Sequence, residues 1–292
     1  MKSVDKKTIR EAAKKAWVNA LVNIPQDVLE ALETAEAKET NPRGKRYLQI
    51  LIENAKKARE LGMVICQDTG VPTYFVKSPL NFPYTDDIRA PFDEAMQELM
   101  QGEFPTRPMV VHPLTRVDRG DNTAAQVPIL HMEFDNSIDY MEIRAMPKGA
   151  GCGVWGTLSI MQPGVGVEGV KKFVVDSVLR AGSNPCPPII VGVGIGGTLE
   201  EVARLATEAS ARPISKRHPE PDIAALEEEL REALNLSQIG PMGMGGDTTA
   251  LAVNIEYAGT HRPWMPVAVN INCWPGRVAT CRVYPDGRIE AL

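Results

Sequence analysis

The stretch PPIIVGVGIGGTLEEVARLATEAS, residues 187–210, carries the clearest fold signal in the chain. Its first half is a short apolar run that leads into glycines, which is typical of a buried strand followed by a tight turn. In its second half apolar residues recur at helical spacing, and Thr198 with Glu201 forms the pattern of a capping box. A buried strand followed by an amphipathic helix indicates the α/β class.

The flanking sequence extends this pattern in both directions. Residues 5–62 have helical periodicity, and most of the strand candidates come later. We therefore predict an α/β (mixed α+β) fold with one domain over residues 1–292, in which a helical region, 1–62, precedes a mixed-sheet body. Further helices are expected at 88–103, 166–182, 198–210 and 221–237, and strands at 64–65, 108–114, 127–134, 140–147, 187–197, 248–258, 265–272 and 278–287.

Composition narrows the functional classes. The 292 residues are 43% hydrophobic and 24% charged, which is ordinary for a globular protein with a sizeable core. The net charge of −5, without a long basic run, argues against nucleic-acid or anionic-membrane partners. The charged N-terminal sequence is unlike a signal peptide, and no run approaches the roughly 20 apolar residues of a membrane span. We expect a cytoplasmic protein.

The glycine motif GVGIGG, residues 192–197, allows three interpretations. It fits G-x-G-x-x-G between a strand and a helix, as in a dinucleotide site. Such a site also needs a second strand ending in an acidic residue about 20 positions later, where this chain has a proline-rich loop. The glycines otherwise form a tight turn, or they shape an anion or cofactor site at the helix N-terminus. A nucleotide-binding enzyme stays open as an alternative.

The five cysteines are widely spaced and odd in number, which does not suggest a disulfide framework. Cys66, Cys186 and Cys273 share one context, the boundary between an apolar strand and a rigid turn. Cys152 lies in a glycine loop, and Cys281 lies inside a predicted strand as a core residue. Three thiolates from distant segments suit an iron–sulfur cluster with one open iron. Zinc, which usually binds local cysteine pairs, and separate buried thiols are the alternatives.

Polar residues near these segments are further candidates. In VICQDTGVP, residues 64–72, an aspartate follows Cys66 closely, which suits a thiolate with a chemical role better than a structural thiol. A histidine in a Gly-Thr-His-Arg turn can act as an acid or base near neutral pH, and arginine forks suit carboxylates. By default such residues are structural or surface groups. The residues concerned are His261, Arg107, Arg116, Arg119 and Lys148, whereas His218 reads as part of a surface loop.

Four motifs together resemble the class I fumarase and L(+)-tartrate dehydratase family of iron–sulfur hydro-lyases. They are CQDTG at 66–70, KGAG at 148–151, NPCPPIIVGVGIGGT at 184–198 and GTHRPWMPVAVNINC at 259–273. The resemblance covers about residues 40–285 and corresponds to the alpha subunit, or N-terminal domain, of that family. It implies a class I fumarase alpha-type fold over residues 1–292.

The resemblance also implies roles for individual residues. Three cysteines would hold a [4Fe–4S] cluster with one iron left open, several polar groups would bind substrate, and a histidine would work with an aspartate in the catalytic group. The implied cluster ligands are Cys66, Cys186 and Cys273, the implied substrate-binding residues are Gln67, Asp68, Arg107 and Gly149, and the implied catalytic residues are Asp68 and His261.

The implied reaction is the reversible hydration or dehydration of a C4 dicarboxylate, either fumarate/malate or L-tartrate/oxaloacetate, with the open iron as Lewis acid. Lys148 resembles the fumarases, whereas Cys152 leans toward the tartrate enzymes, so the substrate stays open. In the family a beta-type subunit supplies the rest of the active site, which implies a hetero- or homo-oligomer. A non-catalytic scaffold subunit is the alternative from another functional class.

Overall fold

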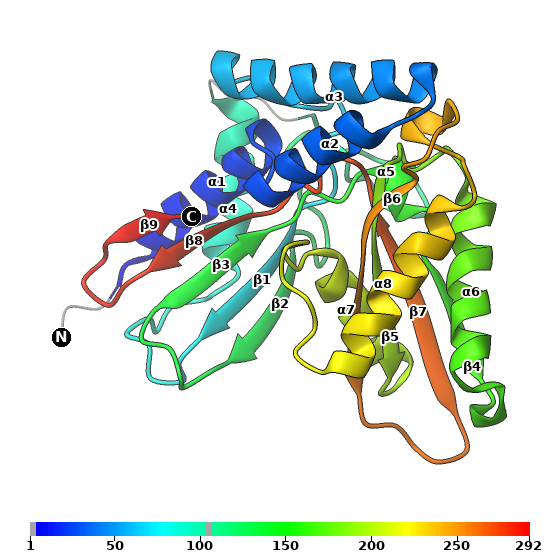
Figure 1. The fold of residues 1–292 in the computed structure, drawn as a ribbon. Helices are drawn as coiled ribbons and strands as arrows, with labels where there is room; N and C mark the ends of the chain where they lie inside the picture. The colour runs from blue at the N-terminus through cyan, green and yellow to red at the C-terminus, as the bar shows by residue number, and fades with distance from the viewer. Residues whose placement is uncertain (1–3, 103–106) are drawn as a thin grey trace. The chain divides into compact units, whose positions relative to one another are not determined.

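The computed structural model describes residues 4–102 and 107–292, and the chain divides into two compact units (Figure 1). Unit 1 combines Met1–Ile24, Ala58–Gly149 and Arg277–Leu292, and unit 2 combines Pro25–Lys57 and Ala150–Gly276. Each unit has its own mixed sheet, so the predicted α/β class is confirmed. The single domain over residues 1–292 stays a prediction.

The helical N-terminal region is also confirmed. It forms α1 (Lys6–Val22), α2 (Gln26–Lys38) and α3 (Pro42–Leu61). Asp5 caps α1, since its side chain accepts a hydrogen bond from the Thr8 N–H at 2.8 Å. Within the described residues, no helix combines the length and apolar character that a bilayer crossing requires.

The sheet of unit 1 has the strand order β2-β1-β3-β8-β9. β1 runs parallel to β2 and antiparallel to β3, and the remaining pairs are antiparallel. The predicted strands near 127–134, 140–147 and 278–287 are confirmed, whereas β1 and β9 were not predicted. The strands are β1 (Thr73–Ser78), β2 (Ile129–Phe134), β3 (Met141–Ala145), β8 (Ala279–Val283) and β9 (Ile289–Ala291).

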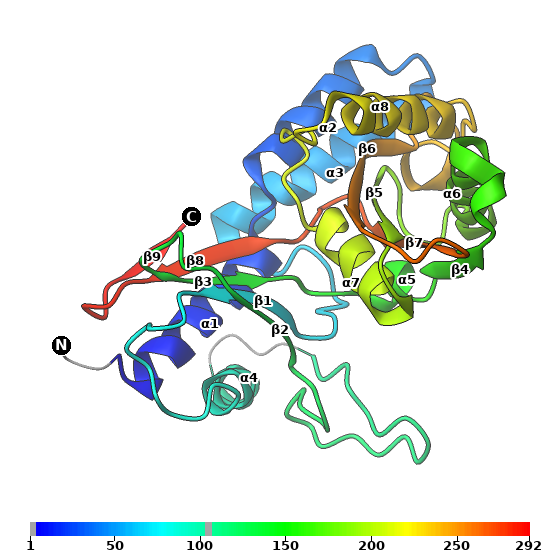
Figure 2. The same cartoon turned by 90° about the horizontal axis from the view of Figure 1, so that it is seen from below.

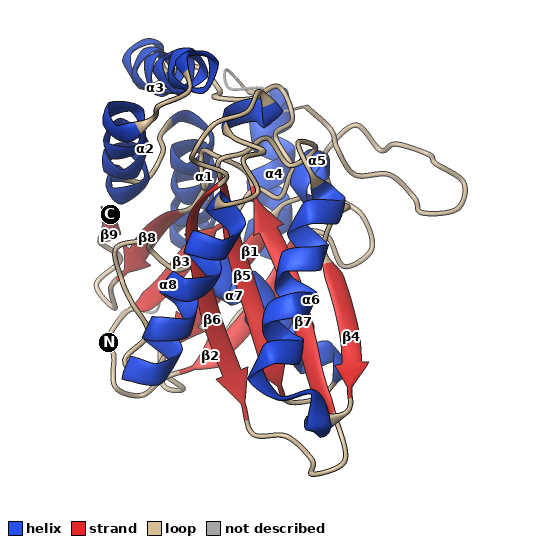
Figure 3. Cartoon of the chain, turned by 45° about the vertical axis from the view of Figure 1, so that its right-hand side comes forward, coloured by secondary structure: helices blue, strands red, loops and turns tan. Residues whose placement is uncertain are grey.

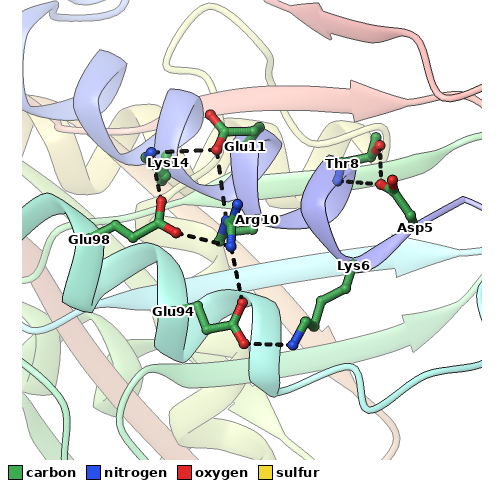
Figure 4. A network of polar contacts seen from close by, with 8 residues as sticks. All are labelled: Asp5, Lys6, Thr8, Arg10, Glu11, Lys14, Glu94 and Glu98. Carbon is green, nitrogen blue, oxygen red and sulfur yellow. Dashed lines mark hydrogen bonds and ion pairs between the residues drawn. The ribbon is translucent and has the colours of Figure 1, made fainter.

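Helices α1 and α4 (Ala90–Gln101) close the core of unit 1. Trp17, Tyr74 and Phe92 meet there, and the rings of Tyr74 and Phe92 lie 4.8 Å apart. Basic side chains of α1 face acidic side chains of α4, including Lys6 with Glu94 at 2.7 Å (Figure 4). The predicted helix at 88–103 is confirmed up to Gln101; Glu103, its last predicted residue, lies outside the described part of the chain.

The sheet of unit 2 has the order β4-β7-β5-β6, in which β5 is parallel to β6 and antiparallel to β7. Figure 3 shows α6 and α8 crossing one face of this sheet. Apolar side chains of both helices join Val191, Val193 and Ile271 in one core. The strands are β4 (Thr157–Met161), β5 (Ile189–Gly196), β6 (Ala250–Ala258) and β7 (Met265–Asn272), and the helices are α5 (Ala150–Gly153), α6 (Gly166–Ala181), α7 (Leu199–Ser210) and α8 (Pro221–Asn235), with 3-10 turns at Pro163–Val165 and Pro241–Gly243.

The glycine motif 192–197 serves helix packing. A Cβ at Gly192 would lie 2.1 Å from the Ala206 carbonyl oxygen, and one at Gly194 would lie 2.2 Å from that of Val202. Only glycine therefore lets α7 pack this closely on β5. Because 192–196 belong to β5 itself, the dinucleotide interpretation of this motif as a phosphate-binding loop is wrong.

The predicted capping box at α7 is wrong in its hydrogen bonds. Thr198 is the N-cap residue, as predicted, but its side chain forms no cap hydrogen bond. The Glu201 carboxylate instead accepts two hydrogen bonds from Arg204, at 3.0 and 2.7 Å. A bidentate arginine–carboxylate pair is stronger than a neutral cap bond, so Arg204 draws Glu201 away from the helix start.

Two predicted strands in unit 1 are also wrong. Residues 64–65, before Cys66, lie in irregular backbone, and the strand starts only at Thr73. Residues 108–114 lie in a long loop between α4 and β2, drawn in teal in Figure 2, where Val111 forms an isolated bridge with Asp118. The prolines at both ends of this apolar run remove backbone donors, which disfavours sheet pairing.

Candidate active site

The turn at residues 66–70 belongs to unit 1 and leads into β1. The Asp68 Oδ1 atom accepts a hydrogen bond from the Gly70 N–H at 2.9 Å, which closes an Asx turn. The Thr69 hydroxyl donates to the Arg107 carbonyl oxygen at 3.0 Å, so the loop that carries Arg107 is fastened to this turn. Gln67 is exposed and Asp68 is half-buried.

The same turn lies against the glycine segment that follows β3. Val71 and Lys148 exchange two backbone hydrogen bonds, at 2.9 and 3.2 Å. A Cβ at Gly149 would lie 3.0 Å from the Asp68 Oδ2 atom, so the Asp68 carboxylate stands over this glycine. The structure thus brings together, within unit 1, three predicted substrate-binding positions that are far apart in sequence: Asp68, Arg107 and Gly149.

Arg277 joins this group, and the sequence patterns did not single it out. The side chain is only 2% exposed, and its Nη1 atom donates to the Asp68 carbonyl oxygen at 2.6 Å. Its Nη2 atom would lie 3.1 Å from a Cβ at Gly149. In the sequence, Arg277 merely follows a Pro-Gly turn and precedes an apolar strand, a pattern that does not reveal burial.

Two of the predicted ligand cysteines lie in unit 2. Cys186 precedes β5 and Cys273 follows β7. These strands are antiparallel neighbours, with Ile190 opposite Asn272, so both cysteines lie at the same end of the sheet. The Trp274 N–H donates to the Cys186 carbonyl oxygen at 3.2 Å and joins the two loops directly.

Further backbone contacts fix the Cys186 loop. Cys186 has a φ of 55°, a left-handed conformation that is costly for residues other than glycine. The Met242 N–H donates to the Pro187 carbonyl oxygen at 2.7 Å, and the Cys186 N–H donates to that of Ser183 at 3.1 Å. The surrounding contacts therefore hold a strained backbone in place.

The five cysteines fall into two groups by burial. Cys66, Cys186 and Cys273 are half-buried, whereas Cys152 and Cys281 are buried. Burial raises the pKa of the Cys281 thiol to about 11, so it stays protonated at neutral pH. No disulfide is formed by these cysteines, all of which lie in the described parts of the chain. The three predicted ligands are thus the cysteines with accessible side chains.

The structure does not bring His261 to the cysteines of unit 2. His261 is exposed in the loop between β6 and β7, with its ring 5.4 Å from that of Trp264. The whole of β7, eight residues long, separates it from Cys273. A strand of that length spans roughly 25 Å, so the two residues lie at opposite ends of the sheet. The predicted partnership of His261 with Asp68 stays a prediction.

The arrangement of potential ligand side chains also bears on binding of a single metal ion. Within residues 4–102 and 107–292, no three His, Cys, Asp or Glu side chains are grouped around a position that suits a single ion.

One family model and several similar proteins match this chain over most of its length. The family model described as fumarate hydratase (fumerase) matches residues 10–282. A Methanocaldococcus jannaschii protein with the provisional name L(+)-tartrate dehydratase subunit alpha is 43% identical over 277 residues, 92% of this chain and 95% of that protein. The L(+)-tartrate dehydratase subunits alpha of Escherichia coli (strain K12) and Shigella boydii serotype 4 are each 36% identical over 269 residues, 92% of this chain and 88% of those proteins.

Proposed function

Because the chain belongs to the fumarate hydratase family, we propose that it is the alpha-type subunit of an iron–sulfur hydro-lyase that acts on a C4 dicarboxylate. The reaction removes water from malate to give fumarate, or from L-tartrate to give oxaloacetate, and runs in reverse by adding water. The family description supports the first substrate pair, and the names of the similar proteins support the second.

The residues present fit a [4Fe–4S] cluster. The donor set is sulfur alone, and Cys66, Cys186 and Cys273 would hold three of its irons. Within unit 2, Cys186 and Cys273 lie at neighbouring strand ends, are half-buried and form no disulfide. In a cluster each thiolate binds its own iron, so its ligands need not surround one point as they do for a single ion. When bound, such a cluster supplies an open iron that acts as a Lewis acid.

The chain's own groups would bind and orient the substrate. The Arg107 guanidinium suits a substrate carboxylate, because its planar fork matches two carboxylate oxygens. Gly149 leaves its backbone open to close approach, and the exposed Gln67 amide can donate to substrate oxygen atoms. The Asp68 Oδ1 atom accepts a hydrogen bond from the Gly70 N–H, and its Oδ2 atom stands over Gly149, where the carboxylate would take up or release a proton.

A partner chain completes the proposal. The names of the similar proteins describe alpha subunits. We therefore assign the remaining acid–base and carboxylate-binding groups to a beta-type partner, within a hetero-oligomer. Arg107 and Asp68 alone would form only part of an active site.

The observation that carries this proposal is the placement of Cys186 and Cys273 at one end of the sheet. The test is anaerobic co-expression with a beta-type partner, followed by iron and sulfide analysis and assays with fumarate, malate and the tartrate isomers. We expect a brown protein with about four irons per chain and reversible hydration of one substrate pair. An iron-free protein, or one inactive toward all of these acids, would overturn the proposal.

A non-catalytic scaffold subunit is the alternative. It would assemble with the partner whether or not Cys186 is intact, and it would show no turnover. Retention of Asp68 together with all three cysteines favours the catalytic function over this one.

A further inference from the structure

Arg277 differs from Arg212, another largely buried arginine, in the groups that its guanidinium contacts. Only 2% of Arg277 is exposed, and its Nε atom has no hydrogen-bond partner among the described residues. Burying a guanidinium is costly unless its donors are used. Arg212, a largely buried arginine of unit 2, also has an Nε atom without a partner among the described residues, but its Nη atoms donate to the carboxylates of Glu227 and Glu256. The Nη1 atom of Arg277 donates to a main-chain carbonyl instead.

That carbonyl belongs to Asp68, 209 positions earlier in the chain. At 2.6 Å the bond is short, as expected when the donor is charged. The Asp68 side chain is held independently through its Oδ1 atom and the Gly70 N–H. Arg277 thus fixes the backbone from which the Asx turn then aims the carboxylate.

The second terminal nitrogen of the Arg277 guanidinium, Nη2, lies beside Gly149. Its Nη2 atom and the Asp68 Oδ2 atom both stand over Gly149, at 3.1 and 3.0 Å from where a Cβ would lie. A charged donor and a carboxylate oxygen therefore border the space that glycine leaves open. Nothing larger than hydrogen fits at residue 149 without displacing one of them.

We propose that Arg277 is a positioning residue that fixes the Asp68 carboxylate over Gly149, where the proposed function places the substrate. This inference rests on the proposed function. A carboxylate acts on a bound substrate only at hydrogen-bond distance, and a displacement of about 1 Å can cost roughly 10²-fold in rate. A buried guanidinium with a bond to the Asp68 backbone restricts that displacement.

Two substitutions test the assignment in the assembled enzyme. Arg277→Met removes both charge and donors at similar length, and Arg277→Lys keeps one charged donor for the Asp68 carbonyl. We expect Arg277→Met to lower kcat about 10²-fold with less than about a threefold change in KM, because positioning acts on the transition state more than on binding. Arg277→Lys should recover about tenfold of this loss.

Hydrogen exchange gives a readout that does not depend on turnover. The Gly70 amide, which donates to Asp68, should exchange roughly tenfold faster in Arg277→Met, because the turn opens more often. In Arg277→Lys its exchange should stay close to that of the unsubstituted chain. The matched control is Arg212→Met, which removes a largely buried arginine of the other unit and should lower thermal stability without changing Gly70 exchange.

The outcomes separate this inference from the proposed function. Unchanged kcat and unchanged Gly70 exchange in Arg277→Met would overturn the positioning role. An equal loss in Arg277→Met and Arg212→Met, with no recovery by lysine, would also overturn it, since it would indicate general destabilisation. An unsubstituted enzyme that converts none of the C4 acids would refute the proposed function, and the exchange measurement would then still decide whether Arg277 holds the turn.

Discussion

The two ends of the four-stranded sheet in unit 2 differ in how closely their loops are held by neighbouring backbone. At one end, Cys186 and Cys273 lie on neighbouring loops joined by a backbone hydrogen bond, and Cys186 has a left-handed backbone conformation. At the other end, His261 lies in an exposed loop, where a Cβ added to Gly259 would meet no other atom within 4 Å. The motif 259–273 runs from one end to the other. Closeness in sequence therefore does not make His261 and Cys273 neighbours in space.

The largest expected effect on activity is at the end of the unit 2 sheet that carries Cys186 and Cys273, here called the cysteine end. Cys186→Ser removes one thiolate ligand, so the proposed cluster should be lost and activity should fall by more than about 10³-fold, because Lewis-acid assistance is worth several kcal/mol. Iron content and turnover of the anaerobic enzyme measure this together. Assembly with the partner should persist.

Cys281→Ser is the matched control, since it changes a sulfur that is fully buried in the core of unit 1. A buried hydroxyl costs about 1–3 kcal/mol of stability but leaves iron content unchanged. Equal iron loss in both variants would break the distinction between accessible and buried cysteines.

Cys281 should react with thiol reagents about 100-fold more slowly than an ordinary thiol. Burial raises the pKa of Cys281 from 9.0 to about 11, so at pH 8 it has about 100-fold less thiolate than an ordinary thiol, and the thiolate is the reactive form. In cluster-free protein, Cys186 and Cys273 should therefore be alkylated first, as peptide mass analysis will show. Early alkylation of Cys281 would contradict its burial.

The same pKa fixes the pH dependence of stability. The folded state favours the neutral Cys281 thiol, whereas the unfolded chain ionises near 9.0. The stabilising contribution is therefore complete below pH 9 and is lost as the pH rises to about 11. Chemical denaturation across this range, with Cys281→Ala as the reference, measures the loss.

The sequence predicted those helices and strands whose ends depend only on residues within or next to the element itself. The helix at Gly166–Ala181 ends at Gly182 as expected, because glycine adopts a φ of 56° there at little cost. β1 was missed because the polar and glycine residues before it resemble a loop. The role of Gly192 was not predictable either, since it depends on how closely α7 packs against β5, which is tertiary information.

The candidate site, too, could be predicted from the sequence only in part. The residue types around Asp68 and Cys186 are enough to indicate chemistry, because a thiol beside a carboxylate suits a reactive or metal-binding thiolate better than a structural thiol. Which of them meet depends on strand register and on contacts across more than 200 positions, as between Arg277 and Asp68. Single-sequence patterns contain no such distances.

A smaller effect, on the free energy of unfolding, should distinguish backbone strain at Cys186 from the role of its thiol as a ligand. Cys186 has a φ of 55°, whereas Cys273 is not among the described residues with a positive φ. In cluster-free protein, Cys186→Gly should raise the free energy of unfolding by about 0.5–1 kcal/mol, because glycine tolerates this conformation. Cys273→Gly should lower it by a similar amount, since glycine adds entropy to the unfolded chain. Equal destabilisation in both variants would show that the loop is not strained.

The smallest expected effect is at the opposite end of the sheet. The family resemblance implies a catalytic His261, whereas the structure places it roughly 25 Å from Cys273, at the far end of β7. If the cysteine end holds the reacting groups of this chain, His261→Asn should change kcat by less than about threefold, because proton transfer requires hydrogen-bond reach. Steady-state assays beside Trp264→Phe, which alters the same exposed loop, distinguish loop damage from loss of the imidazole. A loss of 10²-fold or more in His261→Asn alone would show that the two ends act together, and it would require His261 to reach a reacting centre other than the one at its own chain's Cys273.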